Sequence, residues 1–147
     1  MGMVEKLGEH QSGAHSLWMG ADGVVVHRIV GLVSLDELRS MALWERGQWA
    51  GRARVYALID LSACAGRVSG SLKEITSLYT GSPPRCIAMV GASFATRSLA
   101  NIVIRAVRLL AGRVHDVRFF RDEAAGRAWL EERRSLHVAP PASAVCA

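Results

Sequence analysis

Val55-Tyr-Ala-Leu-Ile-Asp-Leu61 is a near-continuous apolar run, interrupted only by Asp60 near its end. Such a run is typical of a strand buried on both faces, as in a parallel sheet covered by helices. A second apolar run, Cys86-Ile-Ala-Met-Val90, follows the Gly-Ser-Pro-Pro break at residues 81–84, and Val117-Arg-Phe-Phe120 is a third. These three runs predict the strands at the centre of the fold.

Helical patterns separate these strands. Ser34-Leu-Asp-Glu37 and Ser71-Leu-Lys-Glu74 are both capping boxes, and they predict helices over residues 35–49 and 72–80. Apolar spacing predicts a long helix over residues 94–111, and Asp122 and Glu123 favour the start of a final helix. Strand and helix therefore alternate along most of the chain, which is the signature of an α/β domain.

The N-terminal part predicts a hairpin. Strands over residues 15–20 and 24–30 are joined by Ala21-Asp22-Gly23, and Asp-Gly between apolar runs is a strong hairpin signal. The expected fold class is thus α/β, a mixed five-stranded sheet with covering helices in the order β-β-α-β-α-β-α-β-α. We expect residues 1–13 to form a flexible N-terminal arm, residues 14–134 a single domain, and residues 135–147 a disordered tail.

Composition narrows the class of protein. The 147 residues suit one domain, and half of them are hydrophobic, which excludes intrinsic disorder. The formal net charge is +5, but aromatic residues are only 6% and no nucleic-acid-binding motif is present, so we expect no nucleic-acid partner. The apolar runs are too short or too interrupted by Arg to span a membrane, and the N-terminus lacks the apolar segment of a signal peptide. The sequence therefore predicts a cytoplasmic protein.

Catalytic and cofactor motifs are missing from the sequence. The chain has neither a Gly-x-Ser-x-Gly elbow nor a glycine-rich phosphate loop. Its three cysteines form no Cys-x-x-Cys pair and no ligand cluster with histidine. We therefore expect a protein that is not an enzyme, with no catalytic residue, no metal and no cofactor.

The helix over residues 94–111 carries the most suggestive surface. Arg97, Arg105 and Arg108 recur along one side, as a solvated face or as a surface for an acidic partner or a lipid headgroup. Ser93 precedes this helix, as its N-cap or as part of a small-anion site. The opposite side is expected to face the core through Phe94, Leu99, Ile102, Val103, Ala106 and Leu110.

Two tryptophans mark a different kind of candidate site. Trp18 lies in the first expected strand, and Trp44 lies beside the core-facing side of the first helix. Large aromatic side chains in such places line apolar pockets or dimer surfaces. We keep both interpretations open, and an exposed first strand or helix would suit a homodimer.

The same order of elements resembles the STAS superfamily, the fold of bacterial anti-sigma-factor antagonists, and most closely its SpoIIAA-like branch. The resemblance spans about residues 15–133, and its motifs are the segments 57–62, 86–91, 117–125 and 127–130. It implies a mixed five-stranded sheet with helices. It also implies a non-enzymatic regulatory module that acts through protein–protein interaction with a regulator or kinase-like partner.

In that superfamily an Asp-Ser-Ser/Thr-Gly step after the third strand holds the serine that is phosphorylated to switch partners. The matching step here is Val68-Ser69-Gly70-Ser71, so Val68 stands where the family has Asp. The resemblance therefore places the phosphorylation and partner loop at Ser62, Ser69, Gly70 and Ser71, whereas the local pattern alone makes Ser71 a helix N-cap.

A different alternative comes from the same branch, whose arrangement of sheet and helices is similar to that of lipid-transfer domains. That similarity implies a carrier or sensor of a small apolar or anionic, lipid-like ligand.

Overall fold

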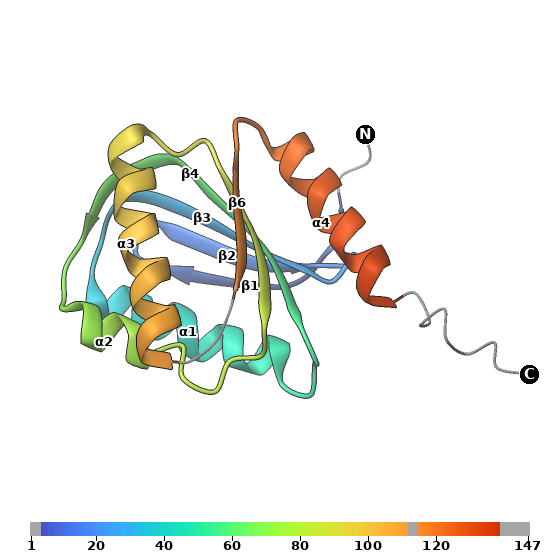
Figure 1. Cartoon of the computed structure of the whole chain (residues 1–147), viewed down its shortest axis with the longest axis horizontal. Helices are drawn as coiled ribbons and strands as arrows, with labels where there is room; N and C mark the ends of the chain where they lie inside the picture. The colour runs from blue at the N-terminus through green and yellow to red at the C-terminus, as the bar shows by residue number, and fades with distance from the viewer. Residues whose placement is uncertain (1–3, 112–114, 139–147) are drawn as a thin grey trace, which may run out of the picture.

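A computed structural model describes residues 4–111 and 115–138 of the chain. Ten elements follow one another along it (Figure 1): β1 (Lys6–Ser12), β2 (His15–Gly20), β3 (Val24–Val33), α1 (Leu35–Trp49), β4 (Val55–Val68), α2 (Leu72–Ser77), β5 (Arg85–Val90), α3 (Phe94–Ala111), β6 (Asp116–Phe120) and α4 (Glu123–Val138). The α/β class predicted from the alternating patterns is confirmed.

In the described part of the chain, the six strands belong to one mixed sheet, in the spatial order β1-β2-β3-β4-β5-β6. The pairs β1–β2 and β2–β3 are antiparallel, so the hairpin predicted at Ala21-Asp22-Gly23 is confirmed. The pairs β3–β4, β4–β5 and β5–β6 are parallel, as the buried apolar character of these strands predicts.

The expected strand count of five is wrong, because the sheet has six strands. The additional strand is β1, in the segment that we expected to be part of a flexible arm. It pairs along most of β2, with His10 opposite Leu17 and Gln11 opposite Ser16. Its sequence, Lys-Leu-Gly-Glu-His-Gln-Ser, has little β propensity of its own, and the pairing with β2 is what orders it.

Two further elements differ in length from the expectation. Strand β4 continues to Val68, beyond the apolar run that ends at Leu61, because β3 stays paired with it as far as Val33 opposite Val68. Ser62, which we expected in the partner loop, therefore lies within the strand. Helix α4 continues to Val138, four residues into the expected tail, and residues 139–147 lie outside the described residues.

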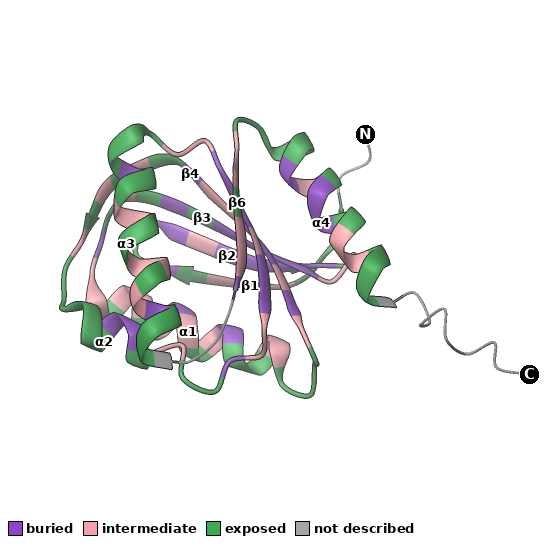
Figure 2. Cartoon of the chain, in the orientation of Figure 1, coloured by how far each residue is buried: buried purple, intermediate pink, exposed green. Residues whose placement is uncertain are grey.

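The helices divide between the two faces of the sheet. Figure 1 shows α4 on one face, and α1, α2 and α3 on the other. Successive side chains of a strand point to opposite faces, so Leu58 contributes to the core under α4, whereas Ile59 and Leu61 point toward α1 and α3. In Figure 2 the buried residues lie mainly along the strands and on the inward sides of the helices.

Both capping boxes predicted from sequence are present. The Ser34 hydroxyl accepts from the Glu37 amide while the Glu37 carboxylate accepts from the Ser34 amide, and Ser71 and Glu74 repeat the arrangement. These caps satisfy amides at the first turn of each helix, so the starting points of α1 and α2 are determined locally.

Candidate functional site

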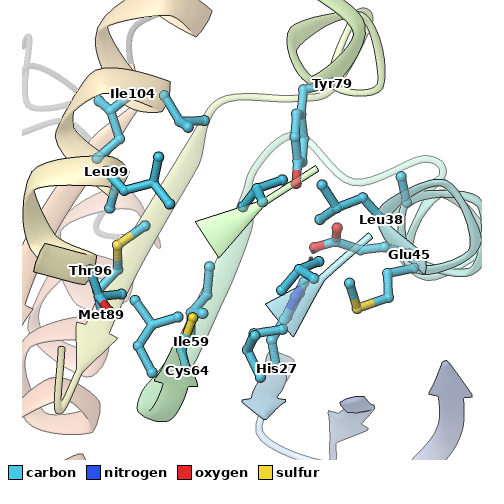
Figure 3. Close-up of a pocket in the computed structure, with 18 residues that line it drawn as sticks. His27, Leu38, Glu45, Ile59, Cys64, Tyr79, Met89, Thr96, Leu99 and Ile104 are labelled. Atoms are coloured by element: carbon cyan, nitrogen blue, oxygen red, sulfur yellow. Dashed lines mark hydrogen bonds and ion pairs between the residues drawn. The ribbon is translucent and has the colours of Figure 1, made fainter. Parts of the chain in front are cut away.

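The most prominent feature of the interior is an apolar cavity of about 160 Å³ between the sheet and the helices α1 and α3. Figure 3 shows side chains from both helices and from the strands around it. Most lining residues are apolar, among them Ile29, Leu38, Met41, Ile59, Leu61, Met89, Leu99, Val103 and Ile104. An engineered cavity of about 150 Å³ with a similar lining binds benzene, so this space suits one ring or a short chain.

A second cavity of about 110 Å³ lies beside the first. The two share part of their lining, including Ile59, Tyr79 and Val103. The second extends toward β5 and β6, where Arg85 and Val117 line it. Together the two cavities run along the α3 side of the sheet.

A buried ionic cluster forms the polar part of this lining. Glu45 is 1% exposed, and its Oε1 accepts from Arg85 Nη1 at 2.8 Å and from His27 Nε2 at 3.3 Å. Arg85 also donates from Nε to the Ser82 hydroxyl at 2.7 Å. Helix α1 and the strands β3 and β5 are therefore joined by charged hydrogen bonds at the edge of an apolar space.

The cluster keeps Glu45 ionised. Burial alone acts to raise the pKa of this carboxyl, but the charges and hydrogen bonds of His27 and Arg85 outweigh it and lower the pKa to about 2. At neutral pH the Glu45 carboxylate is therefore a hydrogen-bond acceptor only.

Tyr79 completes the polar lining from the turn after α2. Its ring lies under the Arg85 guanidinium, 5.4 Å from ring centroid to Cζ. Figure 3 shows the Tyr79 hydroxyl directed toward the sheet, on the side of the cavity where the Glu45 carboxylate lies. Burial, together with the negative charge of Glu45, raises the pKa of Tyr79, so its hydroxyl is protonated at neutral pH.

A surface groove adjoins the larger cavity at the ends of β3 and β4. It has a volume of about 400 Å³, and Val33 and Val68 line both the groove and the cavity. Ser69 lies on its rim, and the Ser69 hydroxyl accepts a hydrogen bond of 3.1 Å from the Leu35 amide at the start of α1. The groove therefore lies between the candidate partner loop and the larger cavity.

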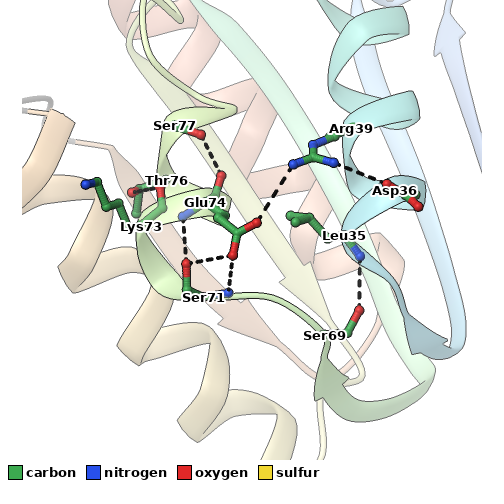
Figure 4. A network of polar contacts seen from close by, with 9 residues as sticks. All are labelled: Leu35, Asp36, Arg39, Ser69, Ser71, Lys73, Glu74, Thr76 and Ser77. Carbon is green, nitrogen blue, oxygen red and sulfur yellow. Dashed lines mark hydrogen bonds and ion pairs between the residues drawn. The ribbon is translucent and has the colours of Figure 1, made fainter.

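Ser71 is engaged differently. Its hydroxyl accepts from the Glu74 amide at 3.2 Å and donates to Glu74 Oε1 at 3.0 Å, as Figure 4 shows. Arg39 of α1 lies 3.8 Å from Glu74 Oε2 and 3.2 Å from Asp36, which links the N-terminal turns of α1 and α2. The structure thus places Ser71 as the N-cap of α2, as its local pattern predicts. Gly70 precedes it with a positive φ of 116°.

Ser62 lies away from both of these serines. Its hydroxyl and its amide both donate to Asp60 Oδ1, at 2.6 and 3.0 Å. Partial burial acts to raise the pKa of Asp60, but these hydrogen bonds and the Arg28 charge hold it below its ordinary value. Close to Ser62, Gly91 has a φ of 71°, and a Cβ there would lie 2.9 Å from the Ser62 Cβ, so only glycine fits this approach of β5 to β4.

The arginines of α3 lie on its outward side, and two of them have contacts within the protein. Arg97 Cζ lies 5.2 Å from the centroid of the Phe119 ring, and Arg108 Nη2 donates to the His115 carbonyl at 2.9 Å. Arg105 is exposed. At the start of the helix the Ser93 hydroxyl accepts from the Thr96 amide at 3.2 Å, which is the N-cap geometry.

The prediction of which α3 residues face the core is partly wrong. Leu99 and Val103 line the cavity, but Phe94, Ile102 and Leu110 are exposed, and Phe94 most of all at 87%. Thr96, Ala100, Ile104 and Val107 take their places on the inward side. Because α3 has apolar residues around most of its circumference, its periodicity did not determine which side would face the sheet.

The two tryptophans do not share one site. Trp18 packs in the core under α4, with Lys6 Nζ 4.3 Å and the Arg28 Cζ 5.2 Å from its ring. Trp44 stacks on His10 of β1, with ring centroids 5.8 Å apart. Among the described residues that line the two cavities, neither tryptophan appears. Strand β2, the expected exposed first strand, lies between β1 and β3.

Sequence reasoning missed the buried cluster itself. One signal was available: Glu45 continues the apolar spacing of Leu38, Met41 and Ala42, so a helix that buries this stripe must also bury an acid. Its partners, His27 and Arg85, come from strands 18 and 40 residues away, and no local pattern connects them.

Comparison with known proteins supports the fold. No protein-family model matches the sequence, and no curated protein matches it. Among solved structures, an uncharacterized protein of the DUF3478 family with a SpoIIAA-like fold, from Shewanella loihica PV-4, has a TM-score of 0.54. Its sequence is 18% identical, and the match covers 88% of this chain and 99% of that one. The chain therefore has a SpoIIAA-like fold.

A second solved structure is the anti-sigma factor antagonist SpoIIAA in its unphosphorylated form. The TM-score is 0.44 at 14% identity, over 82% of this chain and 98% of that one.

In the part of this chain that the structure describes, no helix is long and apolar enough to cross a membrane.

Proposed function

We propose that this protein is a non-enzymatic binding module that holds a small, largely apolar ligand in the cavity between the sheet, α1 and α3. The observation that carries the proposal is the partly open cavity of about 160 Å³ with its apolar lining. Protein interiors contain few voids larger than a water molecule. The apolar side chains around this space lack packing partners on one side. A bound apolar molecule would supply those contacts.

The lining supports an apolar occupant. Side chains such as Ile59, Leu99 and Val103 offer dispersion contacts but no hydrogen bonds. The groove beside Val33 and Val68 supplies a route by which the ligand would enter from solvent. A module of this kind would act as a carrier or a sensor.

The test compares two tryptophan substitutions on α3. Val103→Trp would fill the space, because Val103 lines both cavities, whereas Ile102→Trp places the same ring at a position that is 52% exposed. With toluene as the probe, we expect the wild type and Ile102→Trp to gain thermal stability and Val103→Trp to gain none. An unchanged melting temperature of the wild type at saturating toluene would contradict the proposal.

A second candidate function is protein docking at the segment 62–71, as the SpoIIAA-like fold suggests. The observation that favours it is the contact between the Ser69 hydroxyl and the first amide of α1, at the rim of the exposed groove. A phosphate on Ser69 would add about two negative charges at a helix N-terminus, where the free amides and the helix dipole favour an anion. Ser71 is a poorer acceptor, because a phosphate there would face the Glu74 carboxylate.

Phosphate mapping by mass spectrometry on protein recovered from its native host tests this second candidate. The expected result is phosphate on Ser69 and none on Ser71. Phosphate on Ser71, or none on the chain, would contradict it.

A further inference from the structure

The polar groups of the cavity identify the class of ligand more closely, in an inference that rests on the proposed function. We propose that the cavity binds an uncharged apolar molecule that bears one hydroxyl group, held between the Glu45 carboxylate and the Tyr79 hydroxyl. Hydrocarbons, carboxylates and ammonium compounds of the same size would bind less well.

The first argument is the unused acceptor capacity of Glu45. In the described part of the chain, both hydrogen bonds that this carboxylate accepts end on Oε1, from His27 and Arg85. An ionised carboxylate has room for about four donors, so Oε2 keeps its capacity. Figure 3 shows the carboxylate extending from α1 into the space beside the sheet. The complementary ligand group is therefore a hydrogen-bond donor.

The second argument is the position of Tyr79. Its hydroxyl is directed to the same side of the cavity as the Glu45 carboxylate. Arg85 contacts both groups, since its guanidinium lies over the Tyr79 ring and donates to Glu45 Oε1, which places Tyr79 and Glu45 near each other. A phenolic hydroxyl donates and accepts. A ligand hydroxyl can thus donate to Glu45 and accept from Tyr79, whereas a hydrocarbon leaves both groups without a partner.

The third argument is charge balance. Among the described residues that line the two cavities, the basic groups beside Glu45 are Arg85 and His27, and both are already bonded to Glu45 Oε1. A ligand carboxylate would therefore enter the larger cavity beside the Glu45 carboxylate, and the two like charges would repel each other. An ammonium group would compete with Arg85 Nη1, which already holds Glu45 at 2.8 Å, and would add an unbalanced positive charge.

Four probes of one size separate these cases: toluene, benzyl alcohol, benzoate and benzylammonium. Binding is measured by titration of protein labelled in its methionine methyl groups and followed by NMR. Met41 and Met89 line the larger cavity, whereas Met19 does not, so shifts of the first two with Met19 unchanged locate the probe. We expect benzyl alcohol to bind at least fivefold more tightly than toluene and more than tenfold more tightly than either charged probe.

Tyr79→Phe removes one hydroxyl and keeps the ring on Arg85. We expect this variant to lose about fivefold in affinity for benzyl alcohol, which corresponds to the loss of one hydrogen bond. It should bind toluene as the wild type does. Ile102→Trp serves as the exposed control and should bind all probes as the wild type does.

The outcomes distinguish the two proposals. If toluene and benzyl alcohol both shift Met41 and Met89 with equal affinity, or if benzoate or benzylammonium binds most tightly, the hydroxyl-ligand inference is wrong and the apolar cavity function stands. If no probe shifts either methyl group, the proposed function is wrong, and this inference falls with it.

Discussion

The two faces of the sheet are built in different ways. Under α4 the packing is close: Phe120 and Trp129 have ring centroids 5.7 Å apart, and a Cβ added at Gly126 would lie 3.1 Å from Val90 and 3.3 Å from Ala88. Under α1 and α3 the same strands border two cavities and a buried cluster of charges. One face thus has the density of an ordinary protein core, and the other gives up part of that density.

The strands are common to both faces, so the closely packed α4 face can supply stability while the α1–α3 face contains the cavities that we propose as the ligand site. The charged cluster joins α1 to the sheet through Arg85 and His27 where apolar contacts are reduced by the cavities.

The largest effect is expected from Arg85→Met. This substitution leaves the Glu45 carboxylate buried with His27 as its remaining partner in the cluster, and removing one member of a buried ion pair costs about 4 kcal/mol. Urea denaturation measures the loss. The double variant Glu45→Leu with Arg85→Met should recover most of it, because no unpaired charge is then buried. A loss below about 1 kcal/mol in the single variant would show that the cluster does not hold this face.

The next effect concerns the closely packed face. Leu130→Ala removes a side chain that is 1% exposed in the core under α4, and we expect a loss of about 3.5 kcal/mol in the free energy of unfolding. Leu99→Ala is the corresponding change on the other face, at a half-buried side chain that borders the cavity, and it should cost about 2 kcal/mol, the lower end for this substitution. Equal losses in the two variants would contradict the difference between the faces.

The pH dependence of stability reports on Glu45. Its pKa in the folded protein is about 2, below the ordinary value of 4.5, so its contribution to stability is fully present above pH 4.5. We expect about 3 kcal/mol to be lost as the pH falls from 4.5 toward 2.

Asp60, Glu37 and Glu74 also have lowered pKa values and contribute in the same direction. The measurement is therefore made against Glu45→Gln, which keeps these three groups. Its stability should fall less steeply with acid, and parallel profiles would rule out the role given to Glu45.

The smallest effect tests whether the space is real. Val103→Leu adds one methylene group toward the cavities. We expect the free energy of unfolding, measured by thermal denaturation, to increase by less than about 1 kcal/mol. Ala88→Val adds two methyl groups on the α4 face, where Ala88 is fully buried, and should cost about 2 kcal/mol through overpacking. A comparable penalty at Val103 would mean that the cavity does not accept added volume.

Sequence patterns predicted the parallel strands, the hairpin and both capping boxes because each depends on residues close together in the chain. Strand β1 was missed because its polar, glycine-containing sequence is ordered only by pairing with β2. The orientation of α3 was partly wrong because apolar residues lie on several of its sides, so that Phe94 and Ile102 point outward. Ser69 and Ser71 look alike in sequence, but one contacts α1 and the other caps α2.

Local chemistry therefore accounts for the elements and their order: buried apolar runs make strands, and a serine with a glutamate three residues later starts a helix. The local sequence also places Glu45 in the apolar stripe of α1. The partners of this carboxylate depend on the folded sheet, which brings Arg85 and His27 to it from distant strands. The cavities have the same origin, because an empty volume depends on how whole helices and strands meet and not on any single segment.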